Sequence, residues 1–158
     1  MGRKANKKSK LLIHDRITDG KESIKVGEYA IFLNNKRYIE TNIWIFNCII
    51  CIFVFSDPNF PYLGKILSMW ETRSKMNVRV SWLYHHQEVE GVGVRDIKVN
   101  GAVFESDHCD DNIVQTITRR CQVSPWSRAG VDDEAEYLVV GHYDPVENIV
   151  QMKPGLLQ

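Results

Sequence analysis

The chain has 158 residues, the size of one ordinary domain. Hydrophobic residues make up 44% and charged residues 25%, which excludes a disordered or collagen-like protein. Twenty Lys and Arg balance twenty Asp and Glu, but the first ten positions hold five basic residues and no acidic one, so the remainder is net acidic. An acidic body does not suggest a duplex-DNA footprint and suits a basic partner, such as a cationic peptide tail.

The composition also argues against membrane, secreted and metal-binding proteins. The longest apolar run, Ile43–Phe55, is interrupted by Asn47 and is shorter than the roughly 20 residues that span a bilayer. We expect no secretory signal peptide, and four cysteines are too few for a disulfide scaffold. Cys48 and Cys51 have zinc or redox spacing, but they lie in the apolar run without a second pair. We therefore predict no membrane contact, metal or cofactor.

In chain order, the expected elements are a flexible basic arm followed by many short strands. The arm covers residues 1–22, and any DNA contact by the protein is expected to be weak and confined to it. The clearest strand is Val78–Tyr84, in which Trp82 and Tyr84 share one face. Further strands are predicted at Ile24–Leu33 (two strands around Gly27), Leu63–Trp70, Val103–Ser106, Val114–Ile117, Cys121–Val123, Tyr137–Tyr143 and Ile149–Met152, and short helical turns within Asn112–Arg120 and Asp133–Leu138. This spacing predicts a mostly β protein, a small distorted β-barrel with long loops.

Two groups of polar residues raise the question of catalysis or metal binding. Ser106, His108 and Asp110 have the residue types of a hydrolase triad. Their alternate spacing on a strand makes the side chains point in parallel, which does not favour a relay from Ser to His to Asp. We predict no catalytic residue and expect a polar rim that lines a groove. His85 and His86 are adjacent, so they are poor ligands for one metal, and we expect both to be exposed loop residues.

Three aromatic residues are more informative. Tyr62 opens one predicted strand, and Trp82 and Tyr84 lie on one face of the next. If these strands pair antiparallel, Tyr62 approaches the other two rings. Three rings at a barrel mouth suit a quaternary ammonium, each face contributing about 0.5–1 kcal/mol when exposed and about 2 kcal/mol or more when desolvated. From spacing alone, packing in the core is the more frequent arrangement.

The same segments, in order, resemble the bromo-adjacent homology (BAH) domain. The similarity rests on Pro61-Tyr-Leu-Gly-Lys-Ile66, Trp82-Leu-Tyr-His85, Ser106-Asp-His-Cys-Asp-Asp111 and the closing strand Tyr137-Leu-Val-Val-Gly-His-Tyr-Asp-Pro145. Within the family, the chain resembles the metazoan subgroup of BAH and coiled-coil domain, trinucleotide-repeat-containing BAH and winged-eye proteins. The resemblance covers approximately residues 24–152, without one apolar segment.

The resemblance implies a non-enzymatic, monomeric module of the nucleus that recognises trimethyl-lysine in the histone three tail of the nucleosome and serves transcriptional silencing. The Polycomb-type repressive mark is the first expected target and the heterochromatin-type mark the second. By motif position, the methyl-lysine cage falls on Tyr62, Trp82 and Tyr84, and the peptide-binding residues on Glu88, His108 and Asp110.

Two departures from the family pattern affect this interpretation. The family usually has two acidic residues after the Trp-x-Tyr-His segment, and here only Glu88 is acidic. Tyr38–Asn59 is an atypical apolar insertion where relatives need only a few residues, and our hypothesis is a translated intron or gene-model error. We therefore expect the BAH domain at residues 23–153, with a short tail at 154–158.

Two other functions stay open at this point. In the first, the aromatic rings are core residues, and the domain contacts proteins or the nucleosome surface without binding methyl-lysine. In the second, the chain is a hydrolase that uses His108 with Ser106 or Cys109. The first predicts that Tyr84→Ala melts the domain, and the second requires turnover of ester or peptide substrates.

Overall fold

The computed structural model describes residues 12–14, 16–19, 22–33, 60–72, 75–127 and 134–156. The strands in these residues are β1 Leu12–His14, β2 Arg16–Asp19, β3 Glu22–Lys25, β4 Tyr29–Phe32, β5 Tyr62–Thr72, β6 Lys75–His85, β7 Ala102–Ile113, β8 Ile117–Cys121, β9 Val123–Pro125, β10 Tyr137–Asp144 and β11 Ile149–Met152. Three short 3-10 helices join them: η1 His86–Glu88, η2 Val94–Asp96 and η3 Val114–Thr116. The protein is mostly β, as the dense spacing of short apolar segments predicted.

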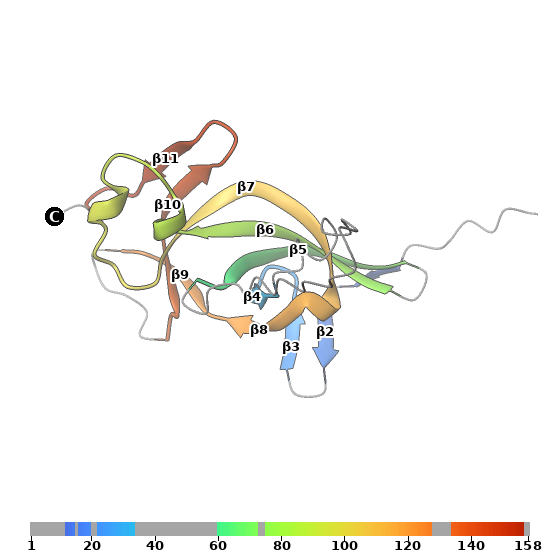
Figure 1. The fold of residues 1–158 in the computed structure, drawn as a ribbon. Coiled ribbons are helices and arrows are strands. Elements are labelled where there is room, and N and C mark those ends of the chain that lie inside the picture. Colours follow the sequence, from blue (N-terminus) through green and yellow to red (C-terminus); the bar gives the residue numbers. More distant parts are fainter. Residues whose placement is uncertain are drawn as a thin grey trace, which may run out of the picture.

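Most strands pair in one mixed sheet, in the order β11-β10-β7-β6-β5-β4-β8, with β1 added to β5 and β9 to β10. Residues 117–125 close this sheet, because β8 pairs with β4 and the chain continues past Gln122 as β9 along β10. The interruption at Gln122 and the parallel pairing of β10 with both β7 and β9 make the barrel irregular. The long, curved β5, β6 and β7 form one wall, and the β2–β3 hairpin projects below β8 (Figure 1). The predicted small, distorted barrel is confirmed.

One core cluster fills the barrel beneath the β4–β5–β6 wall. Phe32, Ile66 and Val80 are almost completely buried in it. Gly64 lies opposite Trp82 in the β5–β6 register, and a Cβ atom there would lie 2.1 Å from Val80 Cγ1 and 3.2 Å from Phe32 Cε2. Because Gly64 has no side chain, Phe32 and Val80 close over this position and support Trp82.

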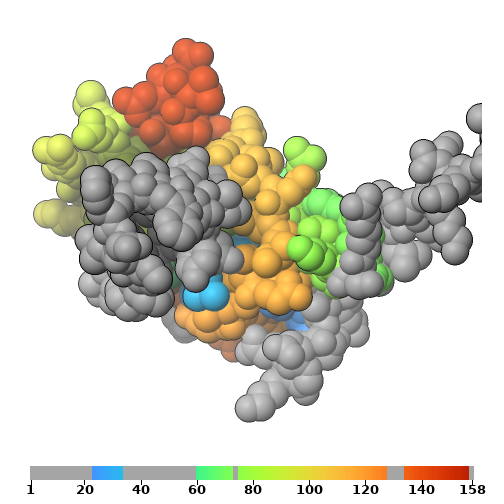
Figure 2. All heavy atoms as spheres, turned by 45° about the vertical axis from the view of Figure 1, so that its right-hand side comes forward, coloured from blue at the N-terminus to red at the C-terminus, as the bar shows by residue number. Residues whose placement is uncertain are grey.

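A second core cluster lies between the β10–β11 hairpin and the segment that carries η1 and η2. Val94, Phe104 and Val140 are completely buried in it. In the space-filling view, the red hairpin stands beside the yellow-green segment on one face of the molecule (Figure 2). Tyr84 packs against this second cluster, whereas Tyr62 and Trp82 pack against the first. The predicted cage residues therefore rest on two different parts of the core.

The pairing of β6 with β7 is interrupted by a bulge beside Trp82. Ser81 pairs with Cys109, and Leu83 pairs with Glu105, so Trp82 alone faces the three residues at positions 106–108. Bulges of this kind re-aim side chains and occur at the rims of barrels. Here the bulge lies where the polar rim was expected.

Two local predictions are wrong. The strand predicted at Val114–Ile117 begins as the helix η3, since Thr116 Oγ1 donates to the Ile113 carbonyl (2.7 Å) and turns the chain. This turn lies inside Asn112–Arg120, where a short helical turn was also expected. The helical turn predicted at Asp133–Leu138 is wrong in its last two residues, which begin β10 and pair with β9.

The ends of the domain also differ from expectation. Leu12–His14 pairs with β5 and Arg16–Asp19 pairs with β3, so this part of the expected flexible arm belongs to sheets. Leu156, expected in the tail, is 8% exposed and packs in the second core cluster. The insertion predicted at Tyr38–Asn59, with its cysteine pair, lies outside the described residues. Within the described residues, no helix is sufficiently long and apolar to cross a bilayer.

Candidate functional site

Tyr62 and Trp82 contact each other where β5 begins. Their ring centroids lie 6.2 Å apart with an interplanar angle of 65°. Trp82 also packs edge-on against Phe32, at 5.3 Å and 73°. Phe32 is 2% exposed, whereas Tyr62 and Trp82 are half-buried, so these two rings lie at the border between the core and solvent. The expected antiparallel pairing of β5 with β6 is confirmed and accounts for this approach.

Tyr84, two residues further along β6, has different neighbours. Tyr143 packs edge-on against its ring at 5.1 Å, and the imidazole of His108 stacks on it at 6.2 Å. The Tyr84 hydroxyl lies 2.6 Å from His108 Nδ1. Burial raises the pKa of Tyr84, and electrostatic interactions with Tyr143, Glu88 and Asp110 raise it further. The hydroxyl therefore keeps its proton at neutral pH.

A continuous chain of polar contacts joins Tyr84 to Trp82. Trp82 Nε1 donates to Asp110 Oδ2 (3.0 Å), and His108 Nε2 lies 3.2 Å from the same oxygen. An ionised carboxylate only accepts, so this contact suits the His108 tautomer that carries its proton on Nε2. In the neutral imidazole Nδ1 then accepts from the Tyr84 hydroxyl. One assignment of protons thus satisfies the whole chain Tyr84–His108–Asp110–Trp82.

Ser106 builds the bulge that places this chain. Its buried hydroxyl donates to the Trp82 carbonyl (2.7 Å) and accepts the His108 backbone N–H (3.2 Å). The Ser106 carbonyl in turn accepts from Ser81 Oγ (2.9 Å). These bonds stabilise the bulge, in which three residues of β7 lie opposite the single residue Trp82 of β6. The bulge brings the His108 imidazole beside Tyr84. The proton of the Ser106 hydroxyl points to a backbone carbonyl and not to the imidazole, so Ser106, His108 and Asp110 do not form a nucleophilic relay.

His85 is buried, and the prediction of an exposed loop histidine is wrong for this residue. It ends β6 at 4% exposure, and its Nε2 lies 2.8 Å from the Pro61 carbonyl. The ring packs edge-on against Phe60 and Tyr137. This contact fixes the backbone immediately before Tyr62. Local sequence pattern does not indicate this contact, because the partner is the backbone carbonyl just before β5, distant in the chain.

Glu88 lies at the end of η1 and contacts the backbone instead of the rings. Its Oε2 accepts the His85 backbone N–H (2.9 Å), which closes the turn after β6. The side chain is exposed, and its charge is near enough to contribute to the raised pKa of Tyr84. Glu88 therefore borders the site at the Tyr84 side.

The structure brings together five of the six predicted site residues by ring contacts or hydrogen bonds, and Glu88 stands at their edge. Tyr143 and Phe32 also support the rings, and sequence reasoning missed both. Tyr143 lies in the Tyr-Asp-Pro segment that closes the domain, but only the fold brings that strand beside Tyr84.

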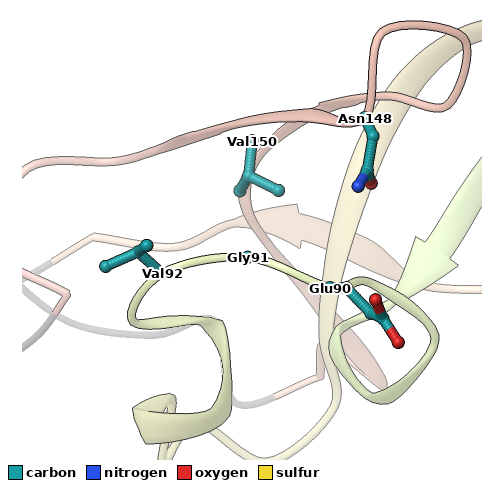
Figure 3. Close-up of a pocket in the computed structure, with 5 residues that line it drawn as sticks. All are labelled: Glu90, Gly91, Val92, Asn148 and Val150. Carbon is teal, nitrogen blue, oxygen red and sulfur yellow. The ribbon is translucent and has the colours of Figure 1, made fainter.

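A separate pocket adjoins the Tyr84 side of the site. It lies between the segment after η1 and the β10–β11 hairpin, and it is lined by Glu90, Gly91, Val92, Asn148 and Val150 (Figure 3). Asn148 Oδ1 accepts a hydrogen bond from the Tyr143 hydroxyl (3.1 Å), which joins this pocket to the ring that packs on Tyr84.

The cysteines and acidic residues do not assemble a metal site in the part of the chain that the structure describes. Cys121 is 4% exposed, and burial raises the pKa of its thiol to about 12, so it is an unreactive core residue. Cys109 is half-buried and is a free thiol.

Comparison with known proteins identifies the family. The model of the BAH domain matches residues 22–146, from β3 to the end of β10. The crystal structure of the yeast Rsc2 BAH domain is similar, with a TM-score of 0.61 and 17% sequence identity. This likeness covers 89% of this chain and 54% of that one, so the chain spans about half the length of the Rsc2 chain, and the likeness concerns the fold. Because the family match extends over most of its length, the chain belongs to the BAH domain family.

Proposed function

We propose that this BAH domain binds trimethyl-lysine in a peptide, with Tyr62, Trp82 and Tyr84 as the walls of the cage. BAH domains are in general chromatin-associated interaction modules and are typically non-catalytic. The observation that carries the proposal is the chain of polar contacts from Tyr84 through His108 and Asp110 to Trp82, with Tyr62 across from the indole.

A trimethylammonium group suits these residues chemically. It keeps its positive charge but has no N–H donor, so it loses little hydrogen bonding when it leaves water. Each aromatic face contributes about 0.5–1 kcal/mol at an exposed site and about 2 kcal/mol or more when desolvated. The hydrogen bonds of Tyr84 to His108 and of Trp82 to Asp110 hold two rings before a ligand arrives, which lowers the entropy cost of binding. Asp110 and Glu88 add attraction for a cation.

The exposure of the three rings supports a binding role over a purely structural one. Phe32 and Phe104, which belong to the core, are at most 2% exposed. Tyr62, Trp82 and Tyr84 are half-buried, although they are larger than most core residues of this domain. Aromatic side chains with one buried side and one accessible side are typical of recognition sites.

The ligand that we propose is the histone three tail, with the Polycomb-type mark first and the heterochromatin-type mark second. Both lysines lie in an Ala-Arg-Lys-Ser context, so their discrimination depends on residues further along the peptide, contacted by His108 and Asp110. The proposal places the protein in the nucleus, on nucleosomes, in transcriptional silencing. The net acidic body favours such a basic tail.

Isothermal titration with histone three peptides, trimethylated and unmethylated at each of the two lysines, tests this proposal. We expect micromolar affinity, about −8 kcal/mol, for the trimethylated peptide only. Trp82→Ala should weaken binding at least about tenfold. Trp70→Ala, at the far end of β5, is the matched control and should bind normally. Unchanged affinity in a folded Trp82→Ala variant would show that the cage assignment is wrong.

A second candidate function is a protein contact that does not involve methyl-lysine. It is favoured by the near-complete exposure of Val92 (98%), which lines the pocket next to Tyr143, and of Val146 (87%), which lies in the turn between β10 and β11. Exposed apolar side chains that gather beside a pocket mark interaction sites. If this function is the main one, Val92→Asp with Val146→Asp abolishes nucleosome binding and Trp82→Ala preserves it.

A further inference from the structure

The carboxylate of Asp110 is already engaged by protein donors beside the Trp82 indole. Its Oδ2 accepts from Trp82 Nε1 (3.0 Å), and His108 Nε2 lies 3.2 Å from the same oxygen. Two protein groups therefore crowd this one carboxylate oxygen. The side chains of His108 and Asp110 are 35% and 34% exposed, so this pair lies at the rim of the site.

We propose that His108 determines the methylation state that the site prefers, by occupying the Asp110 oxygen next to the indole. The inference rests on the proposed function and adds a specificity-determining residue to it. Mono- and dimethyl-lysine carry N–H donors that lose water in a cage and need an acceptor there, whereas trimethyl-lysine carries none. With Oδ2 crowded by these two groups, this oxygen is a poor acceptor for the N–H of the lower methylation states, and the trimethylated state binds best.

The geometry also indicates which change should relax this preference. His108 stacks on Tyr84 through its ring and reaches Asp110 through Nε2. His108→Phe keeps a planar ring over Tyr84 and removes both nitrogens, so Oδ2 becomes available to a ligand N–H. His108→Gln keeps an N–H donor that can reach Asp110. Tyr84→Phe removes only the hydroxyl that bonds Nδ1 and keeps the His108–Asp110 pair.

The experiment is a titration of the whole chain and of these three variants with histone three peptides that carry tri-, di- and monomethyl-lysine. For the wild type we expect the order tri, di, mono. His108→Phe should narrow the ratio of trimethyl to dimethyl affinity by about fivefold or more, by strengthening dimethyl binding. His108→Gln should keep the wild-type ratio. Tyr84→Phe should weaken all three peptides by a similar factor and leave the ratio unchanged.

An equal loss of affinity for all three peptides in His108→Phe would overturn the inference, because a merely structural role moves every affinity together. Methylation-dependent binding would then still support the cage, whereas wild-type binding that ignores methylation would contradict both proposals. Nitrogen NMR of the wild-type chain gives an independent readout that does not depend on a variant. We expect a proton on His108 Nε2 and none on Nδ1, and the reverse tautomer would also overturn the inference.

Discussion

Trp82 and Tyr84 are two residues apart on one face of β6, yet they are held in different ways. Trp82 lies over the barrel core, where Phe32 packs against its indole and Gly64 leaves space for that contact. Tyr84 lies further along β6, beyond the point where β7 bulges, and Tyr143 and His108 contact its ring. The chain of polar contacts through His108 and Asp110 connects the two residues.

This difference indicates that the Trp82 wall of the proposed cage depends on core packing, whereas the Tyr84 wall depends on contacts at the rim. Changes beneath Trp82 should therefore alter the stability of the fold together with binding. Changes around Tyr84 should alter binding with a smaller effect on stability. The predictions below test this division.

The largest effect is expected beneath Trp82. Phe32→Ala should lower the free energy of unfolding by about 3–5 kcal/mol, because it leaves a cavity in the first core cluster and removes the support of the indole. Leu63→Ala, in a separate cluster on the other face of β5, is the matched control for stability. Urea denaturation measures both losses. Under conditions in which both variants are folded, only Phe32→Ala should weaken peptide binding, and equal binding would contradict the support of Trp82 by Phe32.

An intermediate effect is expected at the bulge. Ser106→Ala removes the hydroxyl shared by the Trp82 carbonyl and the His108 N–H, and leaving these buried groups unsatisfied should cost about 1–3 kcal/mol of stability. The same change should release His108 from Tyr84 and reduce affinity. Thr118→Ala on exposed β8 is the control. If Ser106→Ala binds peptide as the wild type does, the bulge does not position the site.

A smaller effect on stability is expected at the rim. Tyr84→Phe removes the hydrogen bond to His108 Nδ1 in a half-buried setting, and it should cost about 0.5–1.5 kcal/mol. Its ring remains, so the domain should keep its fold. Thermal unfolding measures this cost. A collapse of the fold would place Tyr84 in the core with Phe32 and remove the distinction between the two residues.

The smallest effect is expected far from the rings, at the ion pair of Arg119 with Glu136. Two short contacts of 2.9 and 2.6 Å join the groups, and this hydrogen bonding lowers the pKa of Glu136 below its ordinary value. Because the pKa of Glu136 is lower in the folded state, its carboxylate stabilises the fold at every pH above the ordinary carboxylate pKa. This stabilisation is lost as the pH falls through the folded-state pKa. Because Glu136 is 39% exposed, Glu136→Gln should cost less than about 1 kcal/mol at neutral pH, and the difference should vanish in acid. A difference that grows in acid would contradict the assignment.

The sequence predicted the parts of the molecule that follow from local pattern. Alternation along Val78–Tyr84 placed Trp82 and Tyr84 on one face, and turn residues separated the short strands of a barrel. The expected proximity of Tyr62 followed from antiparallel pairing, which the structure confirms. The BAH fold is likewise confirmed.

The remaining features depend on contacts between distant segments. The bulge exists because the Ser106 hydroxyl reaches a carbonyl of another strand, and His85 is buried because Pro61 offers it an acceptor. The spacing argument predicted parallel side chains for His108 and Asp110 but did not reveal that His108 Nε2 approaches the Asp110 carboxylate, or that the two side chains bond Tyr84 and Trp82. Such bonds leave no periodic signal in the sequence.

The most direct test of the central claim replaces the charged nitrogen of trimethyl-lysine by carbon in an otherwise identical histone three peptide. The neutral analogue has the same shape and the same methyl groups. If aromatic faces bind a cation at Tyr62, Trp82 and Tyr84, titration should show that the neutral peptide binds about tenfold or more weakly than the trimethyl-lysine peptide. Equal affinities would show that the site recognises only an apolar shape and would contradict the account.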